Sequence, residues 1–395
     1  MTLPLEGVRL VEYAQYVAGP LCGVLLADLG ADVIKVEPPA GDAYRYVMPV
    51  TPGVGRHFIP LNRGKRSVAI DLKTDEGRRS SDRLLASANI VLHNFPPARA
   101  RRFGLDWDDV HASHPALVVG LVSSYGATGP LAGTRAYDLV AQARAGLLTA
   151  HASPGDRVPV RAGGIPMADL TAGFLLSTGV LAALVRSRES GVGELVEVSL
   201  LAAAMAVQLQ DLVWLPGEAD ESEMHPADRA HLGARAAEIT GGIAMNPYYR
   251  CFEAADGFLA VACLNLAQRR SFLALFGLED ETVDAPDLVP DDPAVLAAKE
   301  AVTAEIERAI AGRPTSAWLD RFESAGVPCG VVQSRETVYA DPQVQAVGLV
   351  GDVEQPGLGS VRLLAPFIRV GDEARAVAAA PELGADTEAV LRALG

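Results

Sequence analysis

The sequence predicts an α/β fold, in which an open, mostly parallel sheet is flanked by helices in a Rossmann-like arrangement and a second, smaller α+β domain follows. Strand and helix patterns alternate through the first half of the chain, as they do in proteins with parallel sheets. From residue 248 the pattern changes to short strands followed by longer helices. The chain has 395 residues, of which 49% are hydrophobic, so about two well-packed domains are expected.

Six segments of the first half have the pattern of strands, and most are rich in valine, isoleucine and leucine. They are residues 8–13, 32–37, 67–72, 90–93, 117–122 and 195–198. A helix is predicted over residues 21–29, after a Gly-Pro pair, and it stops at Gly30. Another begins after Thr74, whose hydroxyl can cap it, and runs to about Ser87. Strands that alternate with helices in this way usually pair in parallel.

Two longer apolar helices are predicted over residues 169–186 and 199–214. The longest apolar run, residues 170–185, would form a helix of roughly 24 Å, which is shorter than the ~30 Å hydrocarbon core of a membrane. We therefore interpret it as a buried core helix and expect no membrane association. The N-terminal segment has neither the basic region nor the apolar region of a secretory signal.

The same patterns predict the domain organisation. Residues 1–215 form a large α/β domain, the charged segment 216–247 is a linker, and residues 248–327 form a small α+β domain. Within the small domain we expect strands at residues 248–252 and 258–262 and helices at residues 267–276, 293–311 and 316–326. The C-terminal segment, residues 328–395, is predicted to return to the large domain.

The charge is unevenly distributed along the chain. The net charge is −15, which argues against nucleic-acid binding because phosphate backbones require a basic surface. Residues 56–102 nevertheless carry eleven Lys and Arg against four acids. This excess favours a site for a polyanionic small ligand, although Arg78 and Arg79 also suit the exposed side of a helix. At the end of a strand, Asn94 and Phe95 with the arginines that follow suit a nucleotide, whose ring packs and whose phosphate pairs with guanidinium.

Several common kinds of site are absent from the sequence. The four cysteines, at positions 22, 251, 263 and 329, have no metal-ligand or C-x-x-C spacing, which favours free thiols and a cytoplasmic location. The seven histidines form no H-E-x-x-H motif, so we expect no metal. There is no G-x-G-x-x-G, no P-loop and no G-x-S-x-G.

The segment GGIPMADLTAGF places an acid at the start of the long apolar helix. Gly163 and Gly164 form a flexible turn, and Asp169 follows shortly after them. The carboxylate can be a simple helix N-cap, which the residues alone favour. It can also be a nucleophile that is kept ionised by the helix dipole and is accessible beside small neighbours.

Seven segments together carry a family resemblance that covers nearly the whole chain in the family's order. They are LPLEGVRLVEYAQYVAGPLCGVLLADLGADVIKVEPPAGD, LNRGKRSVAIDLKTDEG, HNFPPARARRFGLDW, AYDLVAQARAGLL, GGIPMADLTAGF, AGVPCGVVQS and ADPQVQAVG. Each motif alone is only moderately specific. With these motifs the chain resembles the class III coenzyme A transferases, a group that includes formyl-CoA transferase, carnitine CoA-transferase and α-methylacyl-CoA racemase.

The resemblance implies a transferase that moves CoA from an acyl-CoA to a carboxylic acid through mixed-anhydride and aspartyl-CoA thioester intermediates on Asp169. The CoA thioester is then a co-substrate, and no cofactor is permanently bound. An interlocked homodimer is also implied. The positions that match CoA contacts are Lys73, Asn94, Phe95 and Arg102. The positions that match the lining of the active site are Tyr16, Val17, Arg135, Tyr137, Gly163 and Gly164.

The sequence also departs from formyl-CoA transferases. Val17 stands where those enzymes have glutamine, Pro38 stands where they have arginine, and only Gly241 and Gly242 remain of their glycine-rich loop. Formyl or oxalyl substrates are therefore not expected. Four large side chains either enlarge the contact with a bulkier acyl group or pack the loops: Tyr44, Tyr46, Met48 and Tyr125.

Three alternatives to an intermolecular transferase stay open. The first is an α-methylacyl-CoA racemase, but its catalytic histidine would fall at Tyr137, and no histidine lies within ten residues of that position. A phenol with a pKa of about 10 is a poor base at neutral pH. The second is an intramolecular CoA transfer within one dicarboxylic substrate, and the third is a CoA-binding protein without catalytic activity.

Overall fold

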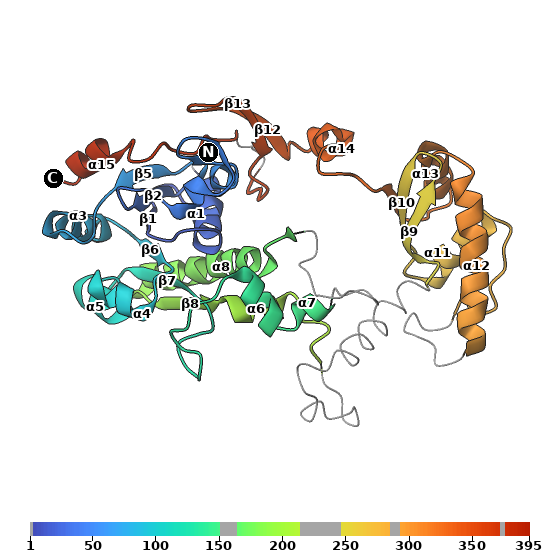
Figure 1. Cartoon of the computed structure of the whole chain (residues 1–395), viewed down its shortest axis with the longest axis horizontal. Helices are drawn as coiled ribbons and strands as arrows, with labels where there is room; N and C mark the ends of the chain where they lie inside the picture. The colour runs from blue at the N-terminus through green and yellow to red at the C-terminus, as the bar shows by residue number, and fades with distance from the viewer. Residues whose placement is uncertain (1–2, 151–163, 214–245, 285–292, 372–375) are drawn as a thin grey trace. The chain divides into compact units, whose positions relative to one another are not determined.

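The computed structural model describes residues 3–150, 164–213, 246–284, 293–371 and 376–395. The backbone divides into two compact units. The first contains residues 1–147, 163–215 and 340–395, and the second contains residues 148–162 and 216–339. Figure 1 shows the elements of each unit.

The first unit is built on a six-stranded sheet in the order β5-β2-β1-β6-β7-β8, in which every pairing is parallel. Its strands are β1 (Arg9–Glu12), β2 (Asp32–Glu37), β5 (Arg66–Ala69), β6 (Ile90–His93), β7 (Val118–Ser123) and β8 (Leu195–Ser199). Each overlaps a segment that was predicted as a strand, so the predicted α/β fold is confirmed.

Helices cover both faces of this sheet (Figure 1). The described helices of this unit are α1 (Ala18–Asp28), α2 (Phe58–Asn62), α3 (Asp75–Ala86), α4 (Pro97–Arg102), α5 (Trp107–Ser113), α6 (Asp138–Arg144), α8 (Met167–Ser190), α9 (Leu200–Ala206), α14 (Pro342–Ala346) and α15 (Thr387–Ala393), and the unit also contains the 3-10 turn η1 (Ala43–Tyr46). Successive strand residues face opposite sides, so Leu10 packs with α1 and α8 whereas Val11 packs with α3 and α5.

The strand order reverses between β1 and β6. The chain continues from β1 to β2 and β5 on one side, and β6, β7 and β8 follow on the other side. In open α/β sheets, ligands bind in the crevice outside the carboxyl ends of the strands at such a reversal. The fold therefore predicts a ligand site at the loops that follow β1 and β6.

Helix α3 begins as the sequence predicts. The Thr74 hydroxyl accepts a hydrogen bond from the Gly77 N–H at 3.0 Å, and Asp75 and Glu76 occupy the first turn. Helix α8 contributes to the core, as predicted, but only one of its faces is buried. Leu176 and Val180 are buried against the sheet, but the outer face is exposed, and by length and composition this helix could cross a membrane. Its 24 residues extend beyond the apolar run on which the prediction was based.

The second apolar helix is shorter than predicted. Helix α9 ends at Ala206, and turns follow to residue 211. Trp214, where the predicted helix ended, lies outside the described residues. The predicted linker lies outside them as well, except for residues 246 and 247.

The second unit contains a three-stranded antiparallel sheet in the order β11-β10-β9. Its elements are β9 (Tyr249–Ala254), β10 (Gly257–Ala262), β11 (Cys329–Val331), α11 (Leu266–Ala274), α12 (Pro293–Ala311) and α13 (Thr315–Ser324). Phe272, Trp318 and Phe322 are buried in its core. The elements α7 (Leu147–Ala150) and η4 (Val338–Ala340) lie where the chain passes between the units.

The C-terminal segment divides differently from the expected boundary at residue 328. Strand β11 pairs with β10 and so belongs to the second unit, whereas residues 340–395 belong to the first. That later part forms the hairpin of β12 (Val350–Gln355) and β13 (Gly359–Leu364) and then α15. Asp386 and Thr387 accept hydrogen bonds from the N–H groups of Ser67 and Ala69, so the chain end covers the edge strand β5. A further small hairpin pairs β3 (Pro49–Thr51) with β4 (Val54–Gly55).

Candidate active site

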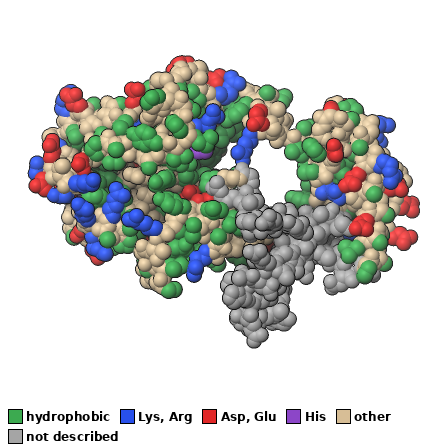
Figure 2. All heavy atoms as spheres, in the orientation of Figure 1, with side chains coloured by type: hydrophobic (Ala, Val, Ile, Leu, Met, Phe, Trp, Pro, Cys, Tyr) green, Lys and Arg blue, Asp and Glu red, His purple; other side chains and the backbone are tan. Residues whose placement is uncertain are grey.

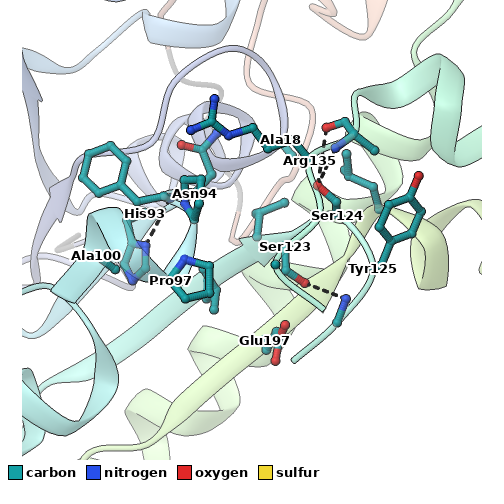
Figure 3. Close-up of a pocket in the computed structure, with 18 of the residues that line it drawn as sticks. Ala18, His93, Asn94, Pro97, Ala100, Ser123, Ser124, Tyr125, Arg135 and Glu197 are labelled. Atoms are coloured by element: carbon teal, nitrogen blue, oxygen red, sulfur yellow. Dashed lines mark hydrogen bonds between the residues drawn. The ribbon is translucent and has the colours of Figure 1, made fainter. Parts of the chain in front are cut away.

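A cavity of about 650 Å³ opens at the carboxyl ends of β6 and β7 and is also lined by residues of β8, and every residue that lines it belongs to the first unit (Figure 3). Seven of the residues that were predicted for the site line this cavity. They are Tyr16, Val17, Asn94, Phe95, Arg135, Tyr137 and Asp169. The fold thus brings together residues from the β1–α1, β6–α4 and β7–α6 loops and the start of α8.

The remaining predicted residues lie elsewhere. Lys73 lines a smaller neighbouring cavity of about 50 Å³, which shares Gln15, Phe95 and Arg99 with the larger one. Arg102 is exposed on α4 and lines neither cavity. Gly164 has a left-handed φ of 69° just before α8 and is not part of the lining. The other predicted glycines, Gly163, Gly241 and Gly242, lie outside the described residues.

Asp169 occupies the third position of α8 and is not its N-cap. The backbone N–H groups of Ala168 and Asp169 both donate to Asp138 Oδ1, at 3.0 and 3.3 Å. Asp138 is buried at the start of α6, and Gln142 Nε2 donates to its other oxygen at 2.7 Å. Because another carboxylate satisfies this helix end, the interpretation of Asp169 as a simple cap is wrong. The Asp169 side chain is partly buried and borders the cavity.

Asn94 joins the two loops at the reversal of strand order. Its Oδ1 accepts the Gln15 N–H at 3.2 Å, and its Nδ2 donates to the Gln15 carbonyl at 2.8 Å. The side chain therefore pairs with the Gln15 backbone as a neighbouring strand would. Sequence patterns predicted Asn94 as a ligand contact and did not reveal this second role.

Arg99 is the arginine of α4 that faces the cavities. Its guanidinium lies 4.5 Å from the centre of the Phe95 ring and 5.7 Å from that of Phe103. Burial, and then the positive charge of Arg135, lower the pKa of Arg99. No described carboxylate forms an ion pair with Arg99. Two cations that face one cavity favour an anionic group such as phosphate. Phe95 precedes α4 and Phe103 follows it, each four residues from Arg99, and this spacing of aromatic side chains around an arginine is the sequence signal that could have identified Arg99.

Ion pairs in the folded chain neutralise part of the excess positive charge of residues 56–102. Arg63 pairs with Asp28, Lys65 with Glu12 and Arg66 with Asp32. All three acids lie outside the segment, so three of the eleven cations are neutralised. Lys and Arg side chains still gather over the region of α3 and α4 (Figure 2).

Tyr16 has a strained backbone, with a φ of 71° in the left-handed region, which is sparsely populated by residues other than glycine. Its ring makes edge contacts with Tyr137 at 5.7 Å and Tyr44 at 5.9 Å between centroids. Burial, and then a hydrogen bond with Tyr137, raise the pKa of Tyr16. Of the four large side chains considered for the acyl site, Tyr125 lines the cavity, whereas Tyr46 and Met48 are exposed and do not line it.

Two hydrogen-bonded turns shape the wall of the cavity (Figure 3). Ser124 Oγ accepts the Ala136 N–H at 2.9 Å and so holds the backbone between Arg135 and Tyr137. His93 Nδ1 accepts the Phe95 N–H at 3.3 Å. Burial lowers the pKa of His93 to about 4, so this imidazole is neutral at neutral pH.

A family model described as CoA-transferase family III matches residues 5–387. The chain belongs to CoA-transferase family III. It is 32% identical to the probable fatty acyl-CoA transferase Rv3272 of Mycobacterium tuberculosis, over 86% of this chain and 85% of that protein. It is 31% identical to the succinate–glutarate CoA-transferase of Agrobacterium fabrum, over 99% of this chain and 96% of that protein.

The solved structures agree with this membership. A CAIB/BAIF family protein from Brucella suis has a TM-score of 0.79 and 29% identity, with 100% of each chain covered. A crystal structure of Rv3272 from Mycobacterium tuberculosis has a TM-score of 0.77 and 28% identity, with 98% of this chain and 99% of that chain covered. The resemblance inferred from the sequence is therefore confirmed. The CoA-transferase family III protein is a transferase enzyme, and enzymes of this kind use CoA thioesters as co-substrates.

Proposed function

We propose that this family III enzyme transfers CoA from an acyl-CoA to a carboxylic acid by covalent catalysis on Asp169. A carboxylate oxygen of Asp169 attacks the donor thioester carbonyl, the C–S bond breaks, and a mixed anhydride and CoA thiolate form. The thiolate then attacks the aspartyl carbonyl, which releases the donor acid and leaves an aspartyl-CoA thioester.

The second half of the reaction reverses these steps with a new acid. The acceptor carboxylate attacks the aspartyl-CoA carbonyl and expels CoA thiolate, and a second anhydride forms. The thiolate attacks its acyl carbonyl, which yields the new acyl-CoA and regenerates the Asp169 carboxylate. A carboxylate suits this role because its acyl and thioester adducts remain reactive, whereas a serine ester would be too stable.

One observation carries the proposal: Asp169 borders the cavity while Asp138 caps the helix. The capping arrangement leaves Asp169 in the first turn of α8, where the helix dipole stabilises an anion by roughly 0.3–1 kcal/mol. The other carboxylates that line the cavity do not lie in the first turn of α8. Asp106 Oδ1 caps α5 by accepting the Asp109 N–H at 3.3 Å, and Glu197 extends from β8.

The proposed CoA site lies beside the reversal of strand order. The Phe95 ring and the Arg99 guanidinium form a stacked surface on which the nucleotide base or its phosphates can rest. Lys73 lies in the adjoining small cavity and provides a further cation for phosphate. The contact of Arg102 with CoA, which the resemblance implies, stays a prediction.

The racemase alternative receives no support from the cavity. Among the described residues that line it, His93 is the single histidine, and the backbone of Phe95 occupies its Nδ1. A group with a pKa of about 4 is a weak base at neutral pH. An intramolecular transfer would use the same steps on Asp169 and differs only in the acceptor.

The exposed apolar face of α8 supports a homodimer. Phe174, Leu175 and Val185 are exposed on α8, and Met205 and Leu209 are exposed at and after α9. Large apolar side chains exposed on two helices that pack together are typical of subunit interfaces. Sedimentation equilibrium would show a dimer, and a monomer at micromolar concentration would exclude one.

Trapping of the covalent intermediate tests the mechanism. Wild-type enzyme and Asp169→Asn are incubated with a panel of acyl-CoAs, treated with hydroxylamine or borohydride, and analysed by intact mass and peptide mapping. We expect an adduct on Asp169 in the wild type, no adduct in Asp169→Asn, and turnover at least roughly 10³-fold lower in the variant. CoA affinity should be retained. Turnover within about tenfold of wild type, or exchange of an α-deuterium without any adduct, would refute the proposal.

A further inference from the structure

The loop between β1 and α1 contains the strained Tyr16 and the buried Val17, both of which line the cavity. A left-handed tyrosine persists only where its surroundings determine the backbone. Asn94 provides one such constraint through Gln15. Two buried lysines provide the others.

Lys35 extends from β2 beneath the start of this loop. Its Nζ donates to the Ala14 carbonyl at 2.9 Å and to Glu12 Oε1 at 3.1 Å, and it lies 2.9 Å from Asp42 Oδ2. Two hydrogen-bond acceptors and one ion-pairing carboxylate therefore surround the ammonium group. The Lys35 side chain has no exposed surface.

Lys65 binds the first turn of α1, directly after the loop, in the same way. Its Nζ donates to the Pro20 carbonyl at 2.8 Å, to Glu12 at 2.8 and 3.0 Å, and to Asn62 Oδ1 at 3.1 Å. Glu12 therefore bridges both lysines from the end of β1, and its side chain is also fully buried. The two lysines bind the carbonyls on either side of residues 15–19.

Helix α1 passes directly over this cluster. A Cβ atom at Gly23 would lie 2.0 Å from Glu12 Oε2 and 3.1 Å from Lys65 Nζ, so only glycine permits the approach. The cluster is thus enclosed by β1, β2, α1 and α2, and it has no direct contact with the cavity, because none of Glu12, Lys35 and Lys65 lines it. The cluster is connected to the loop through two backbone carbonyls, that of Ala14 before Tyr16 and that of Pro20 in the first turn of α1.

We propose that Lys35 and Lys65, bridged by Glu12, are positioning residues for CoA transfer, which hold Tyr16 and Val17 against the reacting groups by binding the carbonyls of Ala14 and Pro20. The inference rests on the proposed function in one respect: it requires that CoA transfer take place in the cavity that the β1–α1 loop lines.

Titration of Lys65 provides a signature of this role. Burial lowers the pKa of Lys65 to about 8. The groups that face it are Glu12, Lys35, Asp42, Asn62 and the thiol of Cys22 on α1. Loss of its proton above pH 8 removes a donor, so one of its acceptors loses its partner. We therefore expect kcat to fall above about pH 8. In Lys65→Arg, whose guanidinium stays charged, this alkaline decline should move to higher pH.

The test variant removes one negative and one positive charge together, because a single substitution would leave an unpaired buried charge. The variant Glu12→Gln/Lys65→Met keeps the cluster neutral, with Lys35 still paired to Asp42. The control Asp28→Asn/Arg63→Met removes a buried ion pair at the opposite end of α1 from the loop. We expect kcat to fall roughly tenfold to a hundredfold in the cluster variant, with the KM for acyl-CoA changed less than about threefold, and to stay within about twofold of wild type in the control.

A double-mutant cycle with Tyr16→Ala separates positioning from general destabilisation. If the cluster acts through the loop, adding Tyr16→Ala to the cluster variant should lower kcat little further. Losses that multiply independently, or a cluster variant with wild-type kcat and pH profile, would overturn the inference. Adduct trapping in the wild type tests covalent catalysis separately from the positioning role. Absence of an Asp169 adduct would refute covalent catalysis. An adduct in the wild type, together with unchanged kcat in the cluster variant, would refute the positioning role.

Discussion

The carboxylate of Asp138 accepts the backbone N–H of Asp169, 31 residues later in the chain, at 3.3 Å. The first residue of α6 thereby caps α8, and the proposed nucleophile takes its position from a side chain on a different helix. The same α6 begins directly after Tyr137, which lines the cavity. Tyr137 and Asp169 are therefore both next to Asp138, Tyr137 as its chain neighbour and Asp169 through a hydrogen bond.

Substitution of this cap should affect both stability and catalysis. We expect Asp138→Ala to lower the free energy of unfolding by about 1–2 kcal/mol, because two helix N–H groups and Gln142 lose their acceptor. Turnover should fall as well, since the first turn of α8 loosens. Urea denaturation and steady-state kinetics measure the two effects. Asp138→Ser, which can still cap, is the matched control and should lose less of both; equal losses in the two variants would contradict the capping role.

Arg99 should contribute more to CoA binding than its neighbour on the same helix. We expect Arg99→Ala to weaken CoA roughly tenfold to a hundredfold, because it removes a charge-assisted contact and the stack on Phe95. Isothermal titration calorimetry at fixed salt measures the change. Arg102→Ala removes the same charge from an exposed position outside both cavities. A larger loss in Arg102→Ala than in Arg99→Ala would show that the phosphates lie on the outer side of α4.

Acidification should destabilise the fold through His93. Its pKa is about 4 in the folded chain, compared with 6.5 for a solvated histidine, so the unfolded chain binds a proton between these values and the folded chain does not. This contribution to stability is complete above about pH 6.5 and is lost as the pH falls toward 4. The difference between the folded and unfolded pKa of His93 corresponds to a loss of about 3 kcal/mol in the free energy of unfolding.

The variant His93→Asn provides the control for this acid sensitivity. Its side-chain oxygen takes the position of Nδ1 and can accept the Phe95 N–H, and it does not titrate. The difference in unfolding free energy between about pH 7 and about pH 4.5 should be smaller in His93→Asn than in the wild type. An identical pH dependence in both proteins would show that His93 is not kept neutral by burial.

Local patterns determined most of the secondary structure of this protein. Strands β6 and β7 are mainly apolar because both faces of a parallel sheet are covered, and α3 begins at Thr74 because its hydroxyl satisfies the Gly77 N–H. These are short-range effects, so they can be inferred from neighbouring residues. The motif segments likewise identified the family, because they occur in the family's order along nearly the whole chain.

Long-range contacts decided what the individual polar residues do. Asp169 has the sequence position of a cap, but Asp138 fills that role, and Lys65 and Arg63 belong to a basic segment but pair with buried acids. Arg99 and Arg102 are alike in sequence, and only the packing of α4 separates them. The sequence by itself determined the elements, the fold class and the family, whereas the tertiary structure decided which charges are satisfied inside the protein and which face the cavity, because pairing depends on distances between residues far apart in the chain.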